Sequence, residues 1–162
     1  MDMSSNEDLK FSQNGVHFQY PKTWKLSDVE WGEDISAITL DFEESGICMI
    51  DIFHNTQAKD LESYINLQMS CFEKELPVFQ KRYGQILSST EKFTSKSGEN
   101  LGRKLEFSVK TIFLFKSTIV NKFFRQEHNQ SISFISYQID KEYVEKTDRE
   151  FQSFFSSYDV QG

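Results

Sequence analysis

The sequence predicts one α+β domain, an antiparallel β-sheet flanked by helices. Three observations predict it: residues 59–76 have a helical period of apolar side chains, residues 141–156 repeat that period, and the stretches before and between them alternate between apolar and polar residues. A chain of 162 residues is long enough for one domain with a sizeable core and too short for two ordinary ones. We expect a polar extension over residues 1–10 and a single domain over residues 11–160.

The first predicted element is a hairpin with Asn14-Gly15 at its turn. Two successive residues with positive φ cost little in Asn-Gly, which is typical of a type I′ turn. Val16, Phe18 and Tyr20 alternate along the second strand and therefore share one face. Pro21 has no N–H to donate and ends the pairing, and we expect Trp24 to pack just beyond it.

A second hairpin is predicted from residues 35–42 and 47–53, which are joined by the polar turn 43–46. Ile50 and Ile52 lie on one face of its second strand. Residues 59–76 then form a helix that Pro77 stops. The helix has a continuous apolar stripe, which is typical of a core face: Leu61, Ile65, Met69, Phe72 and Leu76.

The second half of the chain is rich in predicted strands, over residues 85–93, 101–115, 116–125 and 131–139. Turn residues lie at 97–100 and 126–129, and the last three of these strands read as a three-strand antiparallel meander. Asp140 is a suitable N-cap for the last helix, Lys141 to Ser156. The expected buried side of this helix consists of Tyr143, Thr147, Phe151, Phe154 and Phe155.

The composition is that of a soluble globular protein, with 38% hydrophobic and 27% charged residues and few Gly and Pro. There is no apolar run near the 18 residues that a transmembrane helix needs. The first eight residues are polar and acidic and do not resemble a secretory signal, so we expect a cytoplasmic protein. In that compartment Cys48 and Cys71 are expected to be reduced core residues.

The formal net charge is −7, and the acids are concentrated between Lys25 and Lys59, where there is no Lys or Arg. Such a segment repels nucleic acid and attracts basic proteins. The alternative is an acidic surface that only faces solvent. The candidate partner-binding acidic residues are Asp28, Glu30, Glu33, Asp34, Asp41, Glu43, Glu44 and Asp51.

The order of these motifs resembles the PsbP/DcrB-like superfamily. Four segments show the resemblance. They are Gly15 to Trp24, with its Gly-x-x-Phe-x-Tyr-Pro-x-x-Trp pattern, the helix from Leu61 to Pro77, the turn Ser97 to Arg103 and the closing helix from Tyr143 to Phe154. The superfamily includes an extrinsic photosystem subunit, the Ran-binding Mog proteins, the DcrB lipoproteins and the Eag-type chaperones of bacterial secretion effectors. The Eag-type branch is nearest, because its helix also ends in an acid-Lys/Gln-Leu-Pro pattern. The resemblance implies an α/β/α sandwich that binds proteins and has no shared catalytic residues.

No catalytic or metal-binding motif stands out. His17, His54 and His128 have no metal-ligand spacing, and neither Cys belongs to a Cys-x-x-Cys motif. Asp51 and His54 are close in sequence and read as a surface pair. We therefore expect no enzyme activity, no metal and no cofactor.

Two further features leave alternatives open. Basic residues among the aromatic residues of the later strands would suit a nucleic-acid platform, but the net charge weighs against it. The run Ile112, Phe113, Leu114 and Phe115 would either be covered core or line a groove for an apolar partner segment.

The sequence thus predicts a non-enzymatic bacterial adaptor that binds one protein partner, an effector or toxin encoded nearby, as a monomer or homodimer without nucleic acid or membrane. An immunity protein would use the acidic residues, and a chaperone would use the apolar strand. A small apolar-ligand-binding protein or an enzyme is the alternative.

Overall fold

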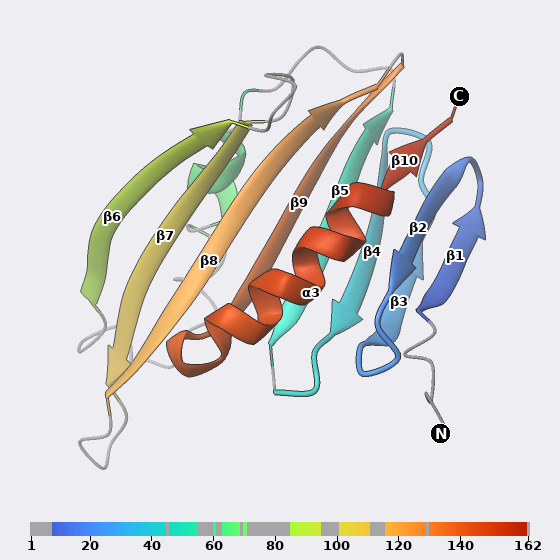
Figure 1. The fold of residues 1–162 in the computed structure, drawn as a ribbon. Helices are drawn as coiled ribbons and strands as arrows, with labels where there is room; N and C mark the ends of the chain where they lie inside the picture. The colour runs from blue at the N-terminus through green and yellow to red at the C-terminus, as the bar shows by residue number, and fades with distance from the viewer. Residues whose placement is uncertain are drawn as a thin grey trace, which may run out of the picture.

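The computed structural model describes residues 8–44, 46–54, 60, 63–68, 70, 85–94, 101–110, 116–128 and 130–161. These residues form two antiparallel sheets (Figure 1). The small sheet has the order β1-β2-β10, from strands Leu9–Gln13, Val16–Tyr20 and Asp159–Val160. The large sheet has the order β3-β4-β5-β9-β8-β7-β6, from strands Lys25–Glu30, Ile35–Asp41, Ile47–His54, Ser131–Asp140, Lys116–Glu127, Leu101–Lys110 and Gln85–Thr94.

Hydrophobic alternation and turn chemistry explain the strand pairs. Asn14 and Gly15 have φ values of 49° and 81°, so the β1–β2 turn is the type I′ turn that the sequence predicts. Strands β7 to β9 form the predicted three-strand antiparallel meander, and β6 extends it by pairing with β7. The segment 111–115 between β7 and β8 lies outside the described residues. Strand β5 then joins the two halves of the sheet by pairing with β9.

The front face of the large sheet is the face that carries helix α3, Val144–Ser157, with the small sheet beside it (Figure 1). Asp140 caps a short 3₁₀ helix, Lys141–Tyr143, by accepting the Glu142 N–H at 3.1 Å, and α3 follows directly. Phe151 and Phe154 are fully buried among aromatic rings. The ring of Phe151 lies 4.6 Å from Tyr137 and 4.9 Å from Phe124, measured between centroids. This aromatic layer is the main core of the described residues.

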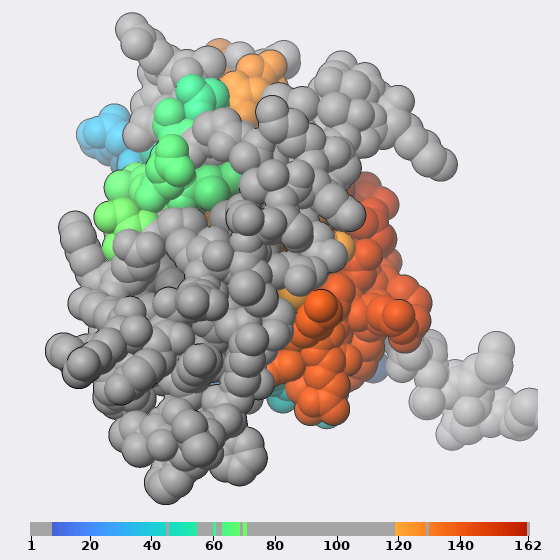
Figure 2. All heavy atoms as spheres, turned by 90° about the vertical axis from the view of Figure 1, so that its left-hand side faces the viewer, coloured from blue at the N-terminus to red at the C-terminus, as the bar shows by residue number. Residues whose placement is uncertain are grey.

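The back face is the opposite face of the sheet, and it carries the helical residues 63–68 and 70. Figure 2 shows this helical segment and α3 on opposite sides of the molecule. Asp60 begins the helical segment by accepting the Ser63 N–H at 2.7 Å, and this hydrogen bond lowers the pKa of Asp60. The ring of Tyr64 stacks on Phe134 of β9, with centroids 4.3 Å apart. The predicted α/β/α arrangement is therefore confirmed.

The structure corrects the sequence prediction at three places. Strands β3 and β10 are not among the predicted elements, because β3 carries Ser27, Asp28 and Glu30 and β10 is only two residues long. The prediction places Tyr143 on the buried side of the last helix, but Tyr143 lies in the 3₁₀ turn and is 37% exposed. The change from 3₁₀ to α-helix at residue 144 rotates it out of the buried stripe.

Candidate functional site

The acidic residues predicted to bind a partner lie on β3, β4, β5 and the two turns that join them. The structure divides them into two groups. Glu43, Glu44 and Asp51 have partners within the chain. We call the remaining residues, which have none among the described part of the chain, the free acids: Asp28, Glu30, Glu33, Asp34 and Asp41.

Glu43 and Glu44 belong to an ion cluster around Lys146 of α3. The Lys146 ammonium donates a short hydrogen bond to Glu44 and lies 3.5 Å from a Glu43 oxygen and 3.8 Å from a Glu150 oxygen. The hydrogen bond with Glu44 is the main reason that the pKa of Lys146 is raised. These acids therefore link the β4–β5 turn to α3, and Lys146 offsets part of their charge.

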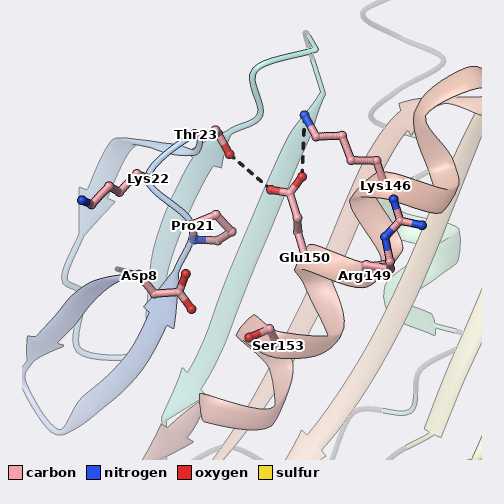
Figure 3. A pocket seen from close by; sticks show the side chains of 8 residues that line it. All are labelled: Asp8, Pro21, Lys22, Thr23, Lys146, Arg149, Glu150 and Ser153. Carbon is pink, nitrogen blue, oxygen red and sulfur yellow. Dashed lines mark hydrogen bonds and ion pairs between the residues drawn. The ribbon is translucent and has the colours of Figure 1, made fainter. Parts of the chain in front are cut away.

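A pocket of about 390 Å³ opens beside this cluster, between α3 and the loop that follows β2 (Figure 3). Glu150 projects from α3 toward this loop and accepts a hydrogen bond from the Thr23 hydroxyl at 3.2 Å. In the same view the Lys22 side chain points away from α3. Since Glu150 is already bonded to Thr23 and Lys146, the polar groups here join the loop to the helix. The pocket is lined by Asp8, Pro21, Lys22, Thr23, Lys146, Arg149, Glu150 and Ser153.

Asp51 is engaged on the back face. The Tyr64 hydroxyl donates a short hydrogen bond to its carboxylate. Burial raises the pKa of Asp51, and the hydrogen bond from Tyr64 opposes that rise. Burial also raises the pKa of the Tyr64 hydroxyl, so Tyr64 stays protonated and acts as the donor. The pair joins the helical segment 63–68 to β5.

The predicted surface pair of Asp51 and His54 is wrong. Alternate residues of a strand share a face, so His54 lies on the same face as Ile50 and Ile52, which belong to the front core. Asp51 lies on the opposite face, where it meets Tyr64. The His54 ring instead hydrogen-bonds the Ser36 hydroxyl, with Nε2 and Oγ 2.8 Å apart. Side chains three positions apart on a strand point to opposite faces, which separates the two groups.

The free acids lie around the end of the sheet that β3 forms. Strand register places Asp28 beside Thr39 and Glu30 beside Ala37, and Ala37 is beside Asp51. These side chains therefore share the back face, as does Asp41 at the end of β4. Glu33 and Asp34 lie in the β3–β4 turn, and all five free acids are exposed. None has an ion pair or a side-chain hydrogen bond with a described residue.

Apolar side chains flank the free acids at the same turn. Trp31 is 38% exposed and Ile35 is 47% exposed. The indole of Trp31 rests partly on Phe11 of the small sheet, with ring centroids 6.3 Å apart. Acids beside exposed aromatic and aliphatic groups make a surface that can bind a partner through both charge and apolar contact.

The second predicted surface, Ile112, Phe113, Leu114 and Phe115, lies outside the described residues. Cys71 does so as well. Cys48 is fully buried, and burial raises the pKa of its thiol, which makes it a core residue without thiolate character. Within the described part of the chain, no group of three or more His, Cys, Asp or Glu side chains is arranged to hold a metal ion. No helix in the same part is long and apolar enough to cross a membrane.

The sequence did not reveal the roles of Tyr64 and Lys146, the two residues that contact Asp51, Glu43 and Glu44 within the fold. The helical period places Tyr64 beside the core stripe, with no signal that its hydroxyl meets Asp51. Lys146 precedes Glu150 by four residues, a spacing that predicts their ion pair on a helix. Its contacts with Glu43 and Glu44 bridge about a hundred residues and depend on the tertiary fold.

Comparison with known proteins shows the fold. No family model and no curated protein sequence matches the chain. Among solved structures, cyanobacterial PsbP from Synechocystis matches with a TM-score of 0.54 and 11% identity, over 99% of this chain and 96% of that one. The Ran-binding protein Mog1p of Saccharomyces cerevisiae matches with a TM-score of 0.52 and 10% identity, over 96% of each chain. A point mutant of the protein Mog1 matches with a TM-score of 0.53 and 10% identity, again over 96% of each chain. The chain therefore has a PsbP/Mog-like fold.

Proposed function

We propose that the chain is a non-enzymatic protein-binding module whose free acids contact a basic surface of its partner. The observation that carries this proposal is the division of the acidic residues. Glu43, Glu44 and Asp51 are used within the fold, whereas the free acids are exposed around β3 and have no partner among the described residues. Uncompensated like charges on one surface repel one another, and a basic partner relieves that repulsion.

Two further observations support a protein as the partner. The net charge of −7 opposes binding to nucleic acid, whose phosphates are also negative. Trp31 and Ile35 expose apolar area beside the acids, which suits a protein interface better than a simple counter-ion. Mog1p, which shares the fold, is described as a Ran-binding protein, so a chain of this architecture can serve as a binding module.

The finer form of the proposal is the neutralisation of a basic effector or toxin, as an immunity protein would perform it, in the cytoplasm. The free acids support this form. The chaperone form, in which Ile112 to Phe115 holds an apolar helix of an effector, rests on the Eag-type resemblance and on the apolar sequence of that run. Changing residues of that run to Ser separates the two forms, because it would weaken only a chaperone complex.

The test is capture of the partner by tagged protein from its own cells, at low and at high salt, followed by mass spectrometry. Three baits are compared: the wild type, a variant with Asp28, Glu30, Glu33 and Asp34 changed to Lys, and a control with Glu43 and Glu44 changed to Lys. We expect a basic protein that the wild type and the control retain and the four-lysine variant loses, with affinity reduced about 100-fold or more.

Salt separates the forms of the proposal further. A complex held by exposed charges weakens at high salt, because the Debye length falls from about 10 Å at 0.1 M to about 3 Å at 1 M. A partner retained equally by all three baits would contradict the acidic surface. A partner with apolar helices that survives high salt would favour the chaperone form instead.

A further inference from the structure

We infer that the outer edge of β3 binds an extended basic segment of the partner as an added strand. This inference rests on the proposed function and states how the free acids would be used. Strand β3 forms one end of the large sheet and pairs only with β4 among the described strands. Each residue of a strand offers its N–H and C=O to one side or the other, so an end strand presents unpaired groups along its outer side.

The edge is accessible. Lys25, Ser27, Asp28 and Glu30 are exposed, and Leu26 and Val29 are half-buried because they face the front core. The small sheet does not continue the large one, because its strands pair only with one another. No backbone hydrogen bond joins Lys25–Glu30 to a described residue other than those of β4.

The edge is short, which sets what it can bind. The register with β4 shifts between Leu26 and Asp28, so regular pairing runs from Asp28 to Glu30. A few ladder hydrogen bonds give little net affinity in water. A segment that binds here therefore needs additional attraction, and the side chains beside the edge determine its nature.

Those side chains select a basic segment and reject a second copy of this chain. Asp28 and Glu30 point to the back face from the regular part of the edge. If the regular parts of two β3 strands paired antiparallel about Val29, Asp28 of each copy would stand opposite Glu30 of the other, which is destabilising. A strand with Lys or Arg at alternate positions places its cations beside these acids. The exposed indole of Trp31 at the end of β3 adds a cation–π surface.

The residues on the front of the sheet determine which side chains the added strand should carry on its other face. Leu26 and Val29 lie against the front core and are partly exposed. The matching segment therefore alternates basic residues with apolar, β-branched residues, which also favour the extended conformation. Main-chain pairing supplies the register, and the alternate side chains supply the specificity.

The test uses a fluorescent peptide of about ten residues in which Lys and Val alternate. Fluorescence anisotropy measures its binding to the wild-type protein at low salt. Two methylated peptides are compared with it, each carrying N-methyl groups on the amides of one edge of the strand. A peptide bound as a strand donates from one edge only, so we expect methylation of that edge to weaken binding about tenfold or more and methylation of the other edge to have little effect.

Variants locate the binding. Changing Asp28 and Glu30 to Lys should weaken binding about tenfold, whereas changing Glu43 and Glu44 to Lys, with the same change in net charge, should alter it less than about twofold. Thermal unfolding of each variant checks that it is folded, and the methylated peptides need no variant at all.

The outcomes separate the inference from the function. Equal binding of all three peptides, with the dependence on Asp28 and Glu30 retained, would overturn strand addition and leave the acidic surface standing. Equal effects of the two double variants would overturn both. The absence of measurable binding by the unmethylated peptide would overturn the inference that an alternating basic strand is the occupant.

Discussion

The two faces of the large sheet use similar residues for different purposes. On the front, aromatic side chains of α3 and the small sheet fill a continuous core, and the acids Glu43 and Glu44 are ion-paired with Lys146. On the back, a smaller cluster surrounds Tyr64, and Asp28, Glu30 and Asp41 remain exposed without ion pairs to described residues. The difference teaches that acidic residues in one sequence segment cannot be treated as one site. Their partners decide which of them stabilise the fold and which are available to another protein.

The largest effect on stability is expected in the front core. Phe151 is fully buried against Tyr137 and Phe124, so Phe151→Ala removes ring contacts and leaves a cavity. We expect the free energy of unfolding to fall by about 3–5 kcal/mol, measured by urea denaturation. A loss below about 1 kcal/mol would mean that α3 is not packed on the sheet as described.

The Tyr64 hydroxyl tests the smaller back cluster. Tyr64→Phe keeps the ring that stacks on Phe134 and removes the hydroxyl, which donates to Asp51 and also interacts with Ser136. A buried acceptor left without its donor costs about 1–3 kcal/mol, and we expect that loss in the free energy of unfolding. Tyr20→Phe is the matched control, because no hydrogen bond of the Tyr20 hydroxyl links it to another element among the described residues. Equal losses in both variants would contradict the role of the Tyr64–Asp51 bond.

Asp51 itself gives a pH-dependent prediction. Burial raises its folded-state pKa above the unfolded value, so the folded protein holds the proton more tightly. The stability contribution of Asp51 is therefore greatest below the unfolded pKa of about 3.9 and is lost as pH rises through the folded pKa. Asp51→Asn removes this titration and keeps an acceptor for Tyr64. We expect the variant to be more stable than the wild type at neutral pH, with the advantage shrinking in acid. Parallel stability curves from neutral to acid pH would contradict this account.

The smallest effect is expected at the Lys146 ion cluster. Lys146 is 44% exposed, and exposed ion pairs contribute little because water and salt screen them. We expect Lys146→Met to lower the free energy of unfolding by about 1 kcal/mol or less. The same substitution frees Glu43 and Glu44, so it should leave binding to a basic partner unchanged or strengthen it slightly. A loss of partner affinity would place the interface on the front of the molecule instead.

The sequence predicts most of the fold because the deciding signals are local. Asn14-Gly15 sets its hairpin turn, alternation sets β2, β4 and β5, and Asp140 caps the last helical segment. Strand β3 could not be predicted in this way. Its inward positions are only Leu26 and Val29, and the register shift between Leu26 and Asp28 breaks the period of two. It forms a strand because β4 offers it a paired edge.

The sequence predicts where the candidate site lies but not which acidic residues belong to it. A run without Lys or Arg shows where acids gather along the chain. Which acids have partners within the fold depends on Lys146 and Tyr64, which reach them from other parts of the chain through the tertiary fold. Local sequence carries no signal for such contacts, so the distinction between paired and free acids needed the structure.

The most direct test of this distinction is the affinity of the captured partner for two variants with equal changes in charge. Isothermal titration calorimetry would compare the Asp28→Lys/Glu30→Lys protein with the Glu43→Lys/Glu44→Lys protein, each checked for folding. The account predicts that the first variant weakens the complex about tenfold or more and that the second changes it less than about twofold. Equal weakening by both variants would show that net charge, and not the surface around β3, governs binding, and would contradict the account.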